Sequence, residues 1–252
     1  MPLGKFSLKY LFKNIGRCFN SEYCKELSDT LWKSRVEWIK SQAKKVPAQS
    51  KVLDVGAGDG AYKSYFKNCE YVAQDFLQTP DLAYGKIDVV SDITNIPLRS
   101  NEFDVILCSE VFEHIPYPEK SLKEIVRLLK PGGKLIFSAP LGSGQHQQPY
   151  HFYGGYTRFW YEKFFPDNGL KIDSLIPNGG QYGHTAELLW RSQPQIIEYF
   201  HSKGIIGRFL AYWVQILVYN LPTVVLWSFE KKQVIEDFTP GFFVTATKVG
   251  KR

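Results

Sequence analysis

The sequence predicts an α/β fold built on a doubly wound parallel sheet. Apolar, strand-like segments alternate with helical patterns between residues 51 and 140, which is the pattern of βαβ units with right-handed crossovers. Residues 103–108 are almost continuously apolar, as expected of a parallel strand buried on both faces. Glycines and acidic residues follow the strands directly, and ligands of such sheets bind beyond the carboxyl ends of the strands.

Length and charge narrow the class of protein. The 252-residue chain has room for one large α/β domain, or for a domain of ordinary size with a substantial insertion. Its net charge of +6 comes from the N-terminal segment, because residues 1–51 hold 11 of the 31 Lys and Arg residues but only 4 of the 25 Asp and Glu residues. Such a segment is either a solvated surface helix or a contact for an anionic membrane surface, a phosphorylated substrate or nucleic acid.

The four cysteines indicate a reducing environment. Cys18, Cys24, Cys69 and Cys108 form no C-x-x-C pair, so the sequence predicts no metal site and a cytoplasmic location. Lysines interrupt the apolar residues of the first 20 positions, so no signal peptide is expected there.

Two helices are expected before the first strand. Residues 5–17 mix aromatic and basic positions that suit a short amphipathic helix, lying on the fold or on a membrane surface. In a longer helix, Trp32, Val36, Ile39 and Ala43 recur at helical spacing. This stripe predicts a buried face that covers one side of the sheet.

The first strand leads directly into three alternate glycines, Gly56, Gly58 and Gly60. Glycine lets the backbone take positive φ and approach a ligand, and a helix over residues 61–69 would direct its N-terminal N–H groups to the same place. The turn by itself fits either a dinucleotide or S-adenosylmethionine (SAM). Asp54 at the strand end favours SAM, whose ammonium and sulfonium groups are positive, over a diphosphate.

Three further strand-like segments place polar residues at the same sheet edge. Residues 71–74 lead to Asp75, whose carboxylate suits the two hydroxyls of a ribose. Residues 87–90 lead to Asp92, which can accept a hydrogen bond from an adenine amino group. The fourth strand leads to Ser109.

With these motifs assembled, residues 51–140 resemble the class I SAM-dependent methyltransferases, particularly the type 11-like group that includes ubiquinone, menaquinone and glycan-modifying methyltransferases. The resemblance rests on Asp75 and on four stretches, which are Val-Leu-Asp-Val-Gly-Ala-Gly-Asp-Gly at 52–60, Ser-Asp-Ile at 91–93, Phe-Asp-Val-Ile-Leu-Cys-Ser-Glu-Val-Phe-Glu-His at 103–114 and Leu-Leu-Lys-Pro-Gly-Gly at 128–133. It implies SAM as the cofactor and methyl transfer as the reaction.

The resemblance also implies which residues hold the cofactor. Gly56, Gly58 and Gly60 would pass beneath its methionine part, Asp75 would hold the ribose, and Ser109 would lie below the sulfonium.

Four further residues complete the implied cofactor site. Phe76 would border the adenine, and Asp92 with Ile93 would read its edge. Asp54 would order the turn or reach the methionine ammonium through water.

The implied sheet is Rossmann-like and seven-stranded, in the order 3-2-1-4-5-7-6 with an antiparallel last strand. Residues 169–175 fit strand six and residues 241–247 fit strand seven. About 65 residues separate them, far more than a hairpin needs, so a helical insertion between strands six and seven is expected. The chain then divides into four parts. They are a basic N-terminal helical segment (1–47), a SAM-binding core (48–180), the insertion as a lid or membrane-facing element (181–238) and the final core strand (239–252).

Within the insertion, residues 209–227 carry no charge and are long enough to cross a bilayer. Topology argues against a span, because it would separate strand seven from the sheet that it completes. Polar residues and Pro222 interrupt the run, which predicts two helices joined near Asn220. The sequence therefore predicts a buried lid or a membrane-facing surface, with peripheral membrane contact through residues 1–17 and 205–229.

The loop after the fifth strand crowds His, Tyr and Arg residues where a methyl acceptor must sit. His151 is the first candidate for a general base and His146 the second. A polar loop that merely leads into the next helix would explain part of the same composition. The candidates for contact with the acceptor are Tyr150, Tyr153, Tyr156, His114 and Arg158, the last of which suits an anionic or hydroxylated group.

These features predict an enzyme that moves a methyl group from SAM to a hydroxyl of a small or lipid-linked acceptor. The first acceptor hypothesis is a sugar of a surface glycan or its precursor, and the second is a lipophilic quinone-like or natural-product molecule. A SAM-binding scaffold without catalysis is the alternative from another class. Nucleic acid is disfavoured, because Ser-Glu-Val-Phe follows the fourth strand where amino-group methyltransferases acting on bases have Asn/Asp-Pro-Pro-Tyr/Phe. The expected location is the cytoplasm, either free or at the inner face of the membrane.

Overall fold

The computed structural model describes residues 15–79, 83–230 and 234–250. Most of the amphipathic helix predicted over residues 5–17, and most of the membrane contact predicted there, lies outside these described residues. Within them, the N-terminal segment begins with a short 3₁₀ helix, η1 (Gly16–Phe19).

The chain folds into two compact units. The core unit comprises Arg35–Asn178 and Gly241–Arg252, and the helical unit comprises Met1–Ser34 and Gly179–Pro240. The sequence-based division kept residues 1–47 as one segment. The structure instead divides this segment after Ser34, because the preceding residues pack with the insertion rather than with the sheet.

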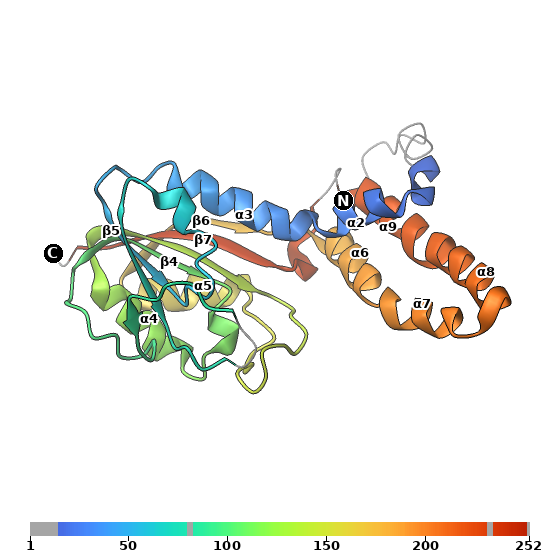
Figure 1. The fold of residues 1–252 in the computed structure, drawn as a ribbon. Coiled ribbons are helices and arrows are strands. Elements are labelled where there is room, and N and C mark those ends of the chain that lie inside the picture. Colours follow the sequence, from blue (N-terminus) through green and yellow to red (C-terminus); the bar gives the residue numbers. More distant parts are fainter. Residues whose placement is uncertain (1–14, 80–82, 231–233, 251–252) are drawn as a thin grey trace. The chain divides into compact units, whose positions relative to one another are not determined.

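The core unit holds a seven-stranded sheet whose order, β3-β2-β1-β4-β5-β7-β6, confirms the predicted one (Figure 1). The first five strands pair in parallel, and β7 runs antiparallel to both β5 and β6. The carboxyl ends of β1 to β5 therefore meet at one edge of the sheet. The strands are β1 (Lys51–Val55), β2 (Glu70–Asp75), β3 (Val89–Val90), β4 (Phe103–Ser109), β5 (Leu129–Pro140), β6 (Leu170–Pro177) and β7 (Gly241–Lys248).

A hydrophobic cluster lies on each side of the sheet, because successive strand residues point to opposite faces. Leu53 of β1 packs in one cluster with helices α4 (Pro118–Leu128) and α5 (Arg158–Asp167). Val52 packs in the other with Ile39 and Ala43 of α3 (Thr30–Ala43). The predicted apolar stripe is thus buried at its C-terminal end. The N-terminal end of the stripe is not buried, since Trp32 remains 57% exposed.

Two elements near the first strands are shorter than predicted. Residues 61–69 form only a 3₁₀ helix, η2 (Lys63–Phe66), in place of the expected α-helix. The segment is short because the chain must return to Glu70, which pairs with Lys51, and a 3₁₀ helix advances farther per residue than an α-helix. Of the strand predicted over residues 87–90, only β3 forms.

The helical unit joins the N-terminal helix α2 (Ser21–Ser28) to the insertion. Cys24 and Leu27 of α2 share a buried cluster with Ala186 and Trp227 of the insertion. Helices α6 and α7 run in one direction, and α8, η4 and α9 return beside them (Figure 1). The insertion consists of α6 (Gln181–Arg191), α7 (Gln193–His201), α8 (Gly204–Val214), η4 (Gln215–Asn220), α9 (Leu221–Glu230) and η5 (Glu236–Phe238).

The two helices predicted around Pro222 are one continuous helix, so that prediction is wrong. A π-helical turn, η4, joins α8 to α9 without a break. Proline lacks an N–H and crowds the preceding turn, and a π-turn is one of the ways in which a helix accommodates such a disruption. Asn220 is buried there, and its Nδ2 donates to the Cys18 carbonyl at 2.7 Å.

This continuous helix, Gly204–Glu230, is long and apolar enough to cross a membrane by length and composition. A third of its most apolar window is buried inside the protein. The sheet argues against a single span, because β6 before the insertion and β7 after it pair directly, with Leu175 opposite Val244.

Candidate cofactor and acceptor site

The glycine turn after β1 has the backbone geometry that only glycine adopts readily. Gly56, Gly58 and Gly60 all have positive φ, at 71°, 54° and 76°. A Cβ atom on Gly56 would lie 2.5 Å from Cγ2 of Val111, so this position has no room for a side chain. Ideal Cβ positions on Gly58 and Gly60 meet no atom within 4 Å. The turn therefore presents open backbone toward the sheet edge.

Asp75 at the end of β2 anchors this turn. Its Oδ2 accepts the N–H of Gly58 at 2.8 Å, and its Oδ1 accepts the N–H groups of Phe76 at 2.6 Å and Leu77 at 3.1 Å. The side chain is buried. The residue predicted to hold a ribose thus also fixes the position of the glycine turn.

Asp54 has a partner within the protein that the sequence analysis did not name. It lies on the sheet face that carries α3, where the Tyr71 hydroxyl donates to its Oδ2. Burial raises the pKa of Asp54 to about 7. The two roles expected from the sequence, ordering the turn and reaching a cofactor ammonium through water, stay predictions.

Phe76, Asp92 and Ile93 line the edge beyond β2 and β3. The Phe76 ring is 36% exposed, and the Tyr150 ring meets it edge-on with centroids 5.7 Å apart. Asp92 accepts both the N–H and the hydroxyl of Thr94 at 2.7 Å, and Ile93 packs against the core. These positions agree with a place at the border of a bound adenine, which stays a prediction.

Ser109 ends β4 beside the glycine turn. Its hydroxyl lies 2.8 Å from that of Ser138 on β5 and 3.5 Å from that of Tyr62. Ser138 in turn donates to Glu110, whose other carboxylate oxygen pairs with Arg35 at 2.7 Å. A polar network therefore crosses the edge between β4 and β5.

Three histidines meet at the carboxyl ends of β4 and β5. His114 lies on the 3₁₀ helix η3 (Phe112–His114), which follows β4, while His146 and His151 lie on the loop after β5. The ring centroids are 4.7 Å apart for His114 and His146, 4.8 Å for His146 and His151, and 5.7 Å for His114 and His151. The structure thus brings together both predicted bases and one predicted acceptor contact.

Each of these imidazoles has a polar neighbour on one ring nitrogen. Nδ1 of His114 donates to the Tyr150 carbonyl at 2.5 Å, and Nδ1 of His146 donates to the Gly144 carbonyl at 2.9 Å. Nε2 of His151 lies 3.0 Å from the Ser143 hydroxyl. Burial is the main cause that lowers the pKa of both His114 and His151, so both rings are neutral at neutral pH.

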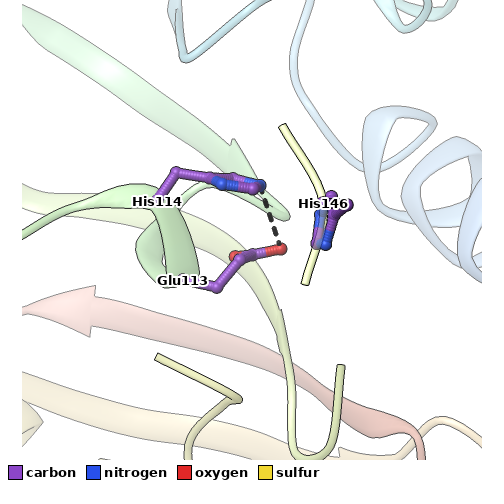
Figure 2. A group of neighbouring side chains, drawn as sticks. All are labelled: Glu113, His114 and His146. Carbon is purple, nitrogen blue, oxygen red and sulfur yellow. Dashed lines mark ion pairs between the residues drawn. The ribbon is translucent and has the colours of Figure 1, made fainter. Parts of the chain in front are cut away.

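Glu113 is a member of this site to which the sequence analysis gave no role. Its side chain is 2% exposed, and its Oε1 lies 3.8 Å from Nε2 of His114. Figure 2 shows its carboxylate pointing toward the two imidazoles of His114 and His146. Burial, followed by the negative charge of Glu110, raises the pKa of Glu113 to about 8. The sequence signal that could have identified Glu113 is the group of two acids and a histidine over residues 110–114, directly after a strand.

Two of the other predicted acceptor contacts remain near this site. The backbone carbonyl of Glu113 accepts the N–H groups of Phe152 at 2.9 Å and Tyr153 at 3.2 Å, which holds the loop over η3. The Tyr153 hydroxyl donates to the Pro116 carbonyl at 3.2 Å. Tyr150 packs its ring against Phe76.

Tyr156 has a position that differs from its predicted contact with the acceptor, whereas the contact predicted for Arg158 stays a prediction. Tyr156 is buried in the core, and its hydroxyl donates to the Phe112 carbonyl at 2.7 Å, so it stabilises the fold. Arg158 begins α5, pairs with Glu162 at 3.6 Å and lies over the Phe242 ring at 5.7 Å. The sequence could not distinguish these residues from their neighbours, because aromatic residues crowd the whole loop.

Comparisons with known proteins identify the domain. Residues 53–137 match the family model described as a methyltransferase domain. The ubiquinone biosynthesis O-methyltransferase of Acinetobacter baumannii (strain AYE) is 32% identical over 118 residues, which cover 41% of this chain and 49% of that protein. An uncharacterised protein of Methanocaldococcus jannaschii is 39% identical over 89 residues, covering 34% of this chain and 38% of that protein. The chain spans about half the length, or less, of these curated relatives.

Solved structures share the fold over most of the chain. The complex between the Haloferax volcanii Trm112 methyltransferase activator and the putative methyltransferase matches with a TM-score of 0.57 at 16% identity, covering 91% of this chain and 94% of that chain. A putative sarcosine dimethylglycine methyltransferase from Galdieria sulphuraria matches with a TM-score of 0.52 at 17% identity, covering 86% and 85%. Residues 53–137 are therefore similar in sequence to a methyltransferase domain, and the core unit that contains them has the fold of the class I SAM-dependent methyltransferases.

Proposed function

We propose that this protein transfers a methyl group from SAM to a hydroxyl oxygen of a lipophilic or lipid-linked acceptor. The observation that carries the proposal is the place of the three histidines. His114, His146 and His151 follow β4 and β5 at the sheet edge where the glycine turn of the methyltransferase domain follows β1. The methyl donor and the candidate bases would therefore share one edge of the sheet.

The residues at the glycine turn fit SAM. Gly58 and Gly60 leave open space in front of the backbone, and the exposed ring of Phe76 offers a surface for an adenine. Asp75 and Asp92 bring negative charge to the edge, which suits a ligand with ammonium and sulfonium groups. When bound, SAM supplies a methyl group on a positively charged sulfur that leaves as a neutral thioether.

The residues of the protein then align the acceptor oxygen and remove its proton. Alignment of two reactants contributes roughly 7–11 kcal/mol to such a displacement, and a positioned base adds about 10²–10⁴-fold. His151 is our candidate base, because Ser143 holds its Nε2 at 3.0 Å and leaves Nδ1 to accept a proton. The acceptor proton passes to His151 while the new O–C bond forms and the S–C bond breaks.

The comparisons favour a quinone-like acceptor over a glycan acceptor. The relatives named ubiquinone biosynthesis O-methyltransferases support a phenolic hydroxyl on a quinone-like ring. The aromatic side chains of Phe76 and Tyr150 at the site would suit such a ring. A sugar hydroxyl of a lipid-linked glycan, the first hypothesis from the sequence, is the second candidate. Both acceptors would be carried on a lipid tail.

An exposed apolar surface on α8 supports a membrane-associated acceptor. Ile205, Ile206 and Phe209 are 86%, 72% and 63% exposed, and contiguous exposed apolar surface on a protein marks an interaction site. The basic residues Lys203 and Arg208 are exposed beside them, and apolar plus basic side chains on one helix favour an anionic lipid surface. We infer that α8 lies on the membrane surface rather than across it.

Vesicle flotation tests this membrane contact. Wild-type protein should float with phosphatidylglycerol-containing vesicles at low salt, and Phe209→Glu should float less. The matched control is Phe159→Glu, since Phe159 is 75% exposed on α5 of the core unit, and it should float like the wild type. Wild-type protein that never floats, or a Phe209→Glu variant that floats equally well, would remove the membrane contact.

Labelled-methyl transfer into cell-extract fractions tests the activity itself. Wild-type protein should label a lipid-extractable molecule, and His151→Ala should lower kcat while SAM affinity stays unchanged. His201→Ala is the matched control, because His201 is an exposed histidine on α7. Normal turnover of His151→Ala would refute the role of this base. Tight SAM binding without label in any fraction would instead support the catalytically inactive scaffold.

A further inference from the structure

We propose that residues 85–88, which lie between β2 and β3, hold the glycine turn in the conformation that binds SAM. We call this segment the strap, and Gly85 in it is a positioning residue for the cofactor. The inference rests on the SAM site at the glycine turn. It does not depend on the acceptor or on the general base proposed above.

The strap contacts the turn through the backbone of Gly58. The Gly85 N–H donates to the Gly58 carbonyl at 2.9 Å. The N–H of the same residue donates to Oδ2 of Asp75 at 2.8 Å. Glycines are conformationally permissive, so a turn built on them has to be fixed by its neighbours. The end of β2 holds one polar group of Gly58, and the strap holds the other.

The approach of the strap to the turn is so close that only glycine fits at position 85. A Cβ atom there would overlap the carbonyl oxygen of Asp59, and it would lie 2.8 Å from the carbonyl carbon of Asp59 and 3.3 Å from the Gly60 nitrogen. These are backbone atoms, which cannot turn aside as the end of a long side chain can. The strap therefore packs directly against the peptide between Asp59 and Gly60.

The other end of the strap is fixed to β2. The Asp88 N–H donates to the Ala73 carbonyl at 2.9 Å, and Oδ2 of Asp88 accepts the Ala73 N–H at 3.0 Å. Ala73 is buried within β2 and lies opposite Asp54 of β1. Only two residues separate Gly85 from Asp88. A side chain added at position 85 would therefore displace the turn rather than the strap.

The fixed turn matters for the part of SAM that it faces. Gly58 and Gly60 present open backbone, where the methionine part of SAM is expected. A turn that is already fixed binds its ligand without a further ordering cost, which raises affinity. Displacement of the peptide after Asp59 should therefore weaken contacts with the methionine part. The expected contacts of the ribose and adenine, at Asp75 and Phe76, would remain.

Titration calorimetry on the full-length protein with S-adenosylhomocysteine and with adenosine tests this division. In Gly85→Ala, the dissociation constant of S-adenosylhomocysteine should rise by at least about tenfold. Adenosine lacks the methionine part and should bind as it does to the wild type. The matched control is Gly250→Ala, because a Cβ atom there would meet only Pro131, at 4.0 Å. Unchanged affinity for S-adenosylhomocysteine, or an equal loss for both ligands, would overturn the inference.

A second substitution tests the fixed end of the strap. Asp88→Ala removes the side-chain bond to the Ala73 N–H, so the strap can move away from an added methyl group. The double variant Gly85→Ala/Asp88→Ala should therefore regain part of the affinity for S-adenosylhomocysteine that Gly85→Ala loses. A double variant that binds no better than Gly85→Ala would contradict the role of this anchor.

Amide hydrogen exchange tests the strap in the wild type. If the strap favours the binding conformation of the turn, the bound ligand must stabilise the strap by the same free energy. Saturating S-adenosylhomocysteine should therefore slow exchange of the Gly85 N–H, which the Gly58 carbonyl accepts. Unchanged exchange at Gly85 in the bound protein would overturn the inference.

None of these measurements uses a methyl acceptor, so they separate the strap from the proposed function. A protein that shows the expected binding and exchange but transfers no methyl group would retain the strap and lose the proposed function. An active methyltransferase whose affinity for S-adenosylhomocysteine is unchanged in Gly85→Ala would lose the strap alone.

Discussion

Replacing Asp75 tests the link between the glycine turn and the cofactor. Its carboxylate accepts backbone N–H groups from Gly58, Phe76 and Leu77 at 2.8, 2.6 and 3.1 Å. Hydrogen bonds to a charged group contribute about 1.5–3 kcal/mol each. Phe76 and Leu77 are more than a third exposed, so their N–H groups regain water in Asp75→Ala. The Gly58 bond then dominates, and the free energy of unfolding should fall by about 2–4 kcal/mol.

The same variant should also lose SAM affinity. Two charged hydrogen bonds to ribose hydroxyls, at about 1.5 kcal/mol or more each, correspond to at least roughly a hundredfold in the dissociation constant. Urea unfolding and SAM calorimetry measure the two effects separately. Asp167→Ala is the control, because Asp167 is an exposed acid at the end of α5.

Two outcomes would refute this reasoning about Asp75. A folded Asp75→Ala protein with wild-type SAM affinity would contradict the ribose contact. Unchanged stability would contradict the anchoring of the turn through Gly58.

Three further predictions concern stability. Asp54 has a folded-state pKa of about 7, so the folded protein keeps a proton that the unfolded chain loses near pH 4. The stability of the wild type therefore falls as the pH rises, and in urea unfolding Asp54→Asn should gain roughly 3 kcal/mol relative to the wild type between pH 5 and pH 8. Parallel pH profiles of the two proteins would contradict this. The free energy of unfolding of Gly56→Ala should fall by at least about 1–2 kcal/mol, because of the positive φ at this position alone. Any further loss comes from the contact with Val111, and Val111→Ala should recover part of it. A Gly56→Ala protein as stable as the wild type would contradict this. Tyr156→Phe should lose about 1 kcal/mol with its bond to the Phe112 carbonyl at wild-type kcat, and a large fall in kcat would return Tyr156 to the acceptor site.

Much of the sheet could be predicted because its signals are local. The apolar strand before Gly56 and the polar residue after each strand identified the ligand edge, and the motifs of residues 51–140 implied the strand order. The helix expected over residues 61–69 failed because the pairing of Glu70 with Lys51 overrides local propensity. The helix break expected at Pro222 failed because a π-turn absorbs the proline within one continuous helix.

The acceptor side of the site was less accessible from the sequence. His151 and His146 were recognised by their residue type and place in the chain. Their approach to Glu113 depends on how two loops close over the sheet edge, which no local pattern encodes. Burial likewise separated Tyr156, which lies in the core, from Tyr150, which lies at the site.

The most direct test of the account is transfer of a labelled methyl group from SAM to a lipid extract by the purified protein. The account predicts label in a molecule with a free hydroxyl, at a rate that Asp75→Ala reduces through SAM affinity and His151→Ala reduces through kcat. A protein that binds SAM in one equivalent but labels neither the lipid extract nor any other fraction of the cell would contradict it.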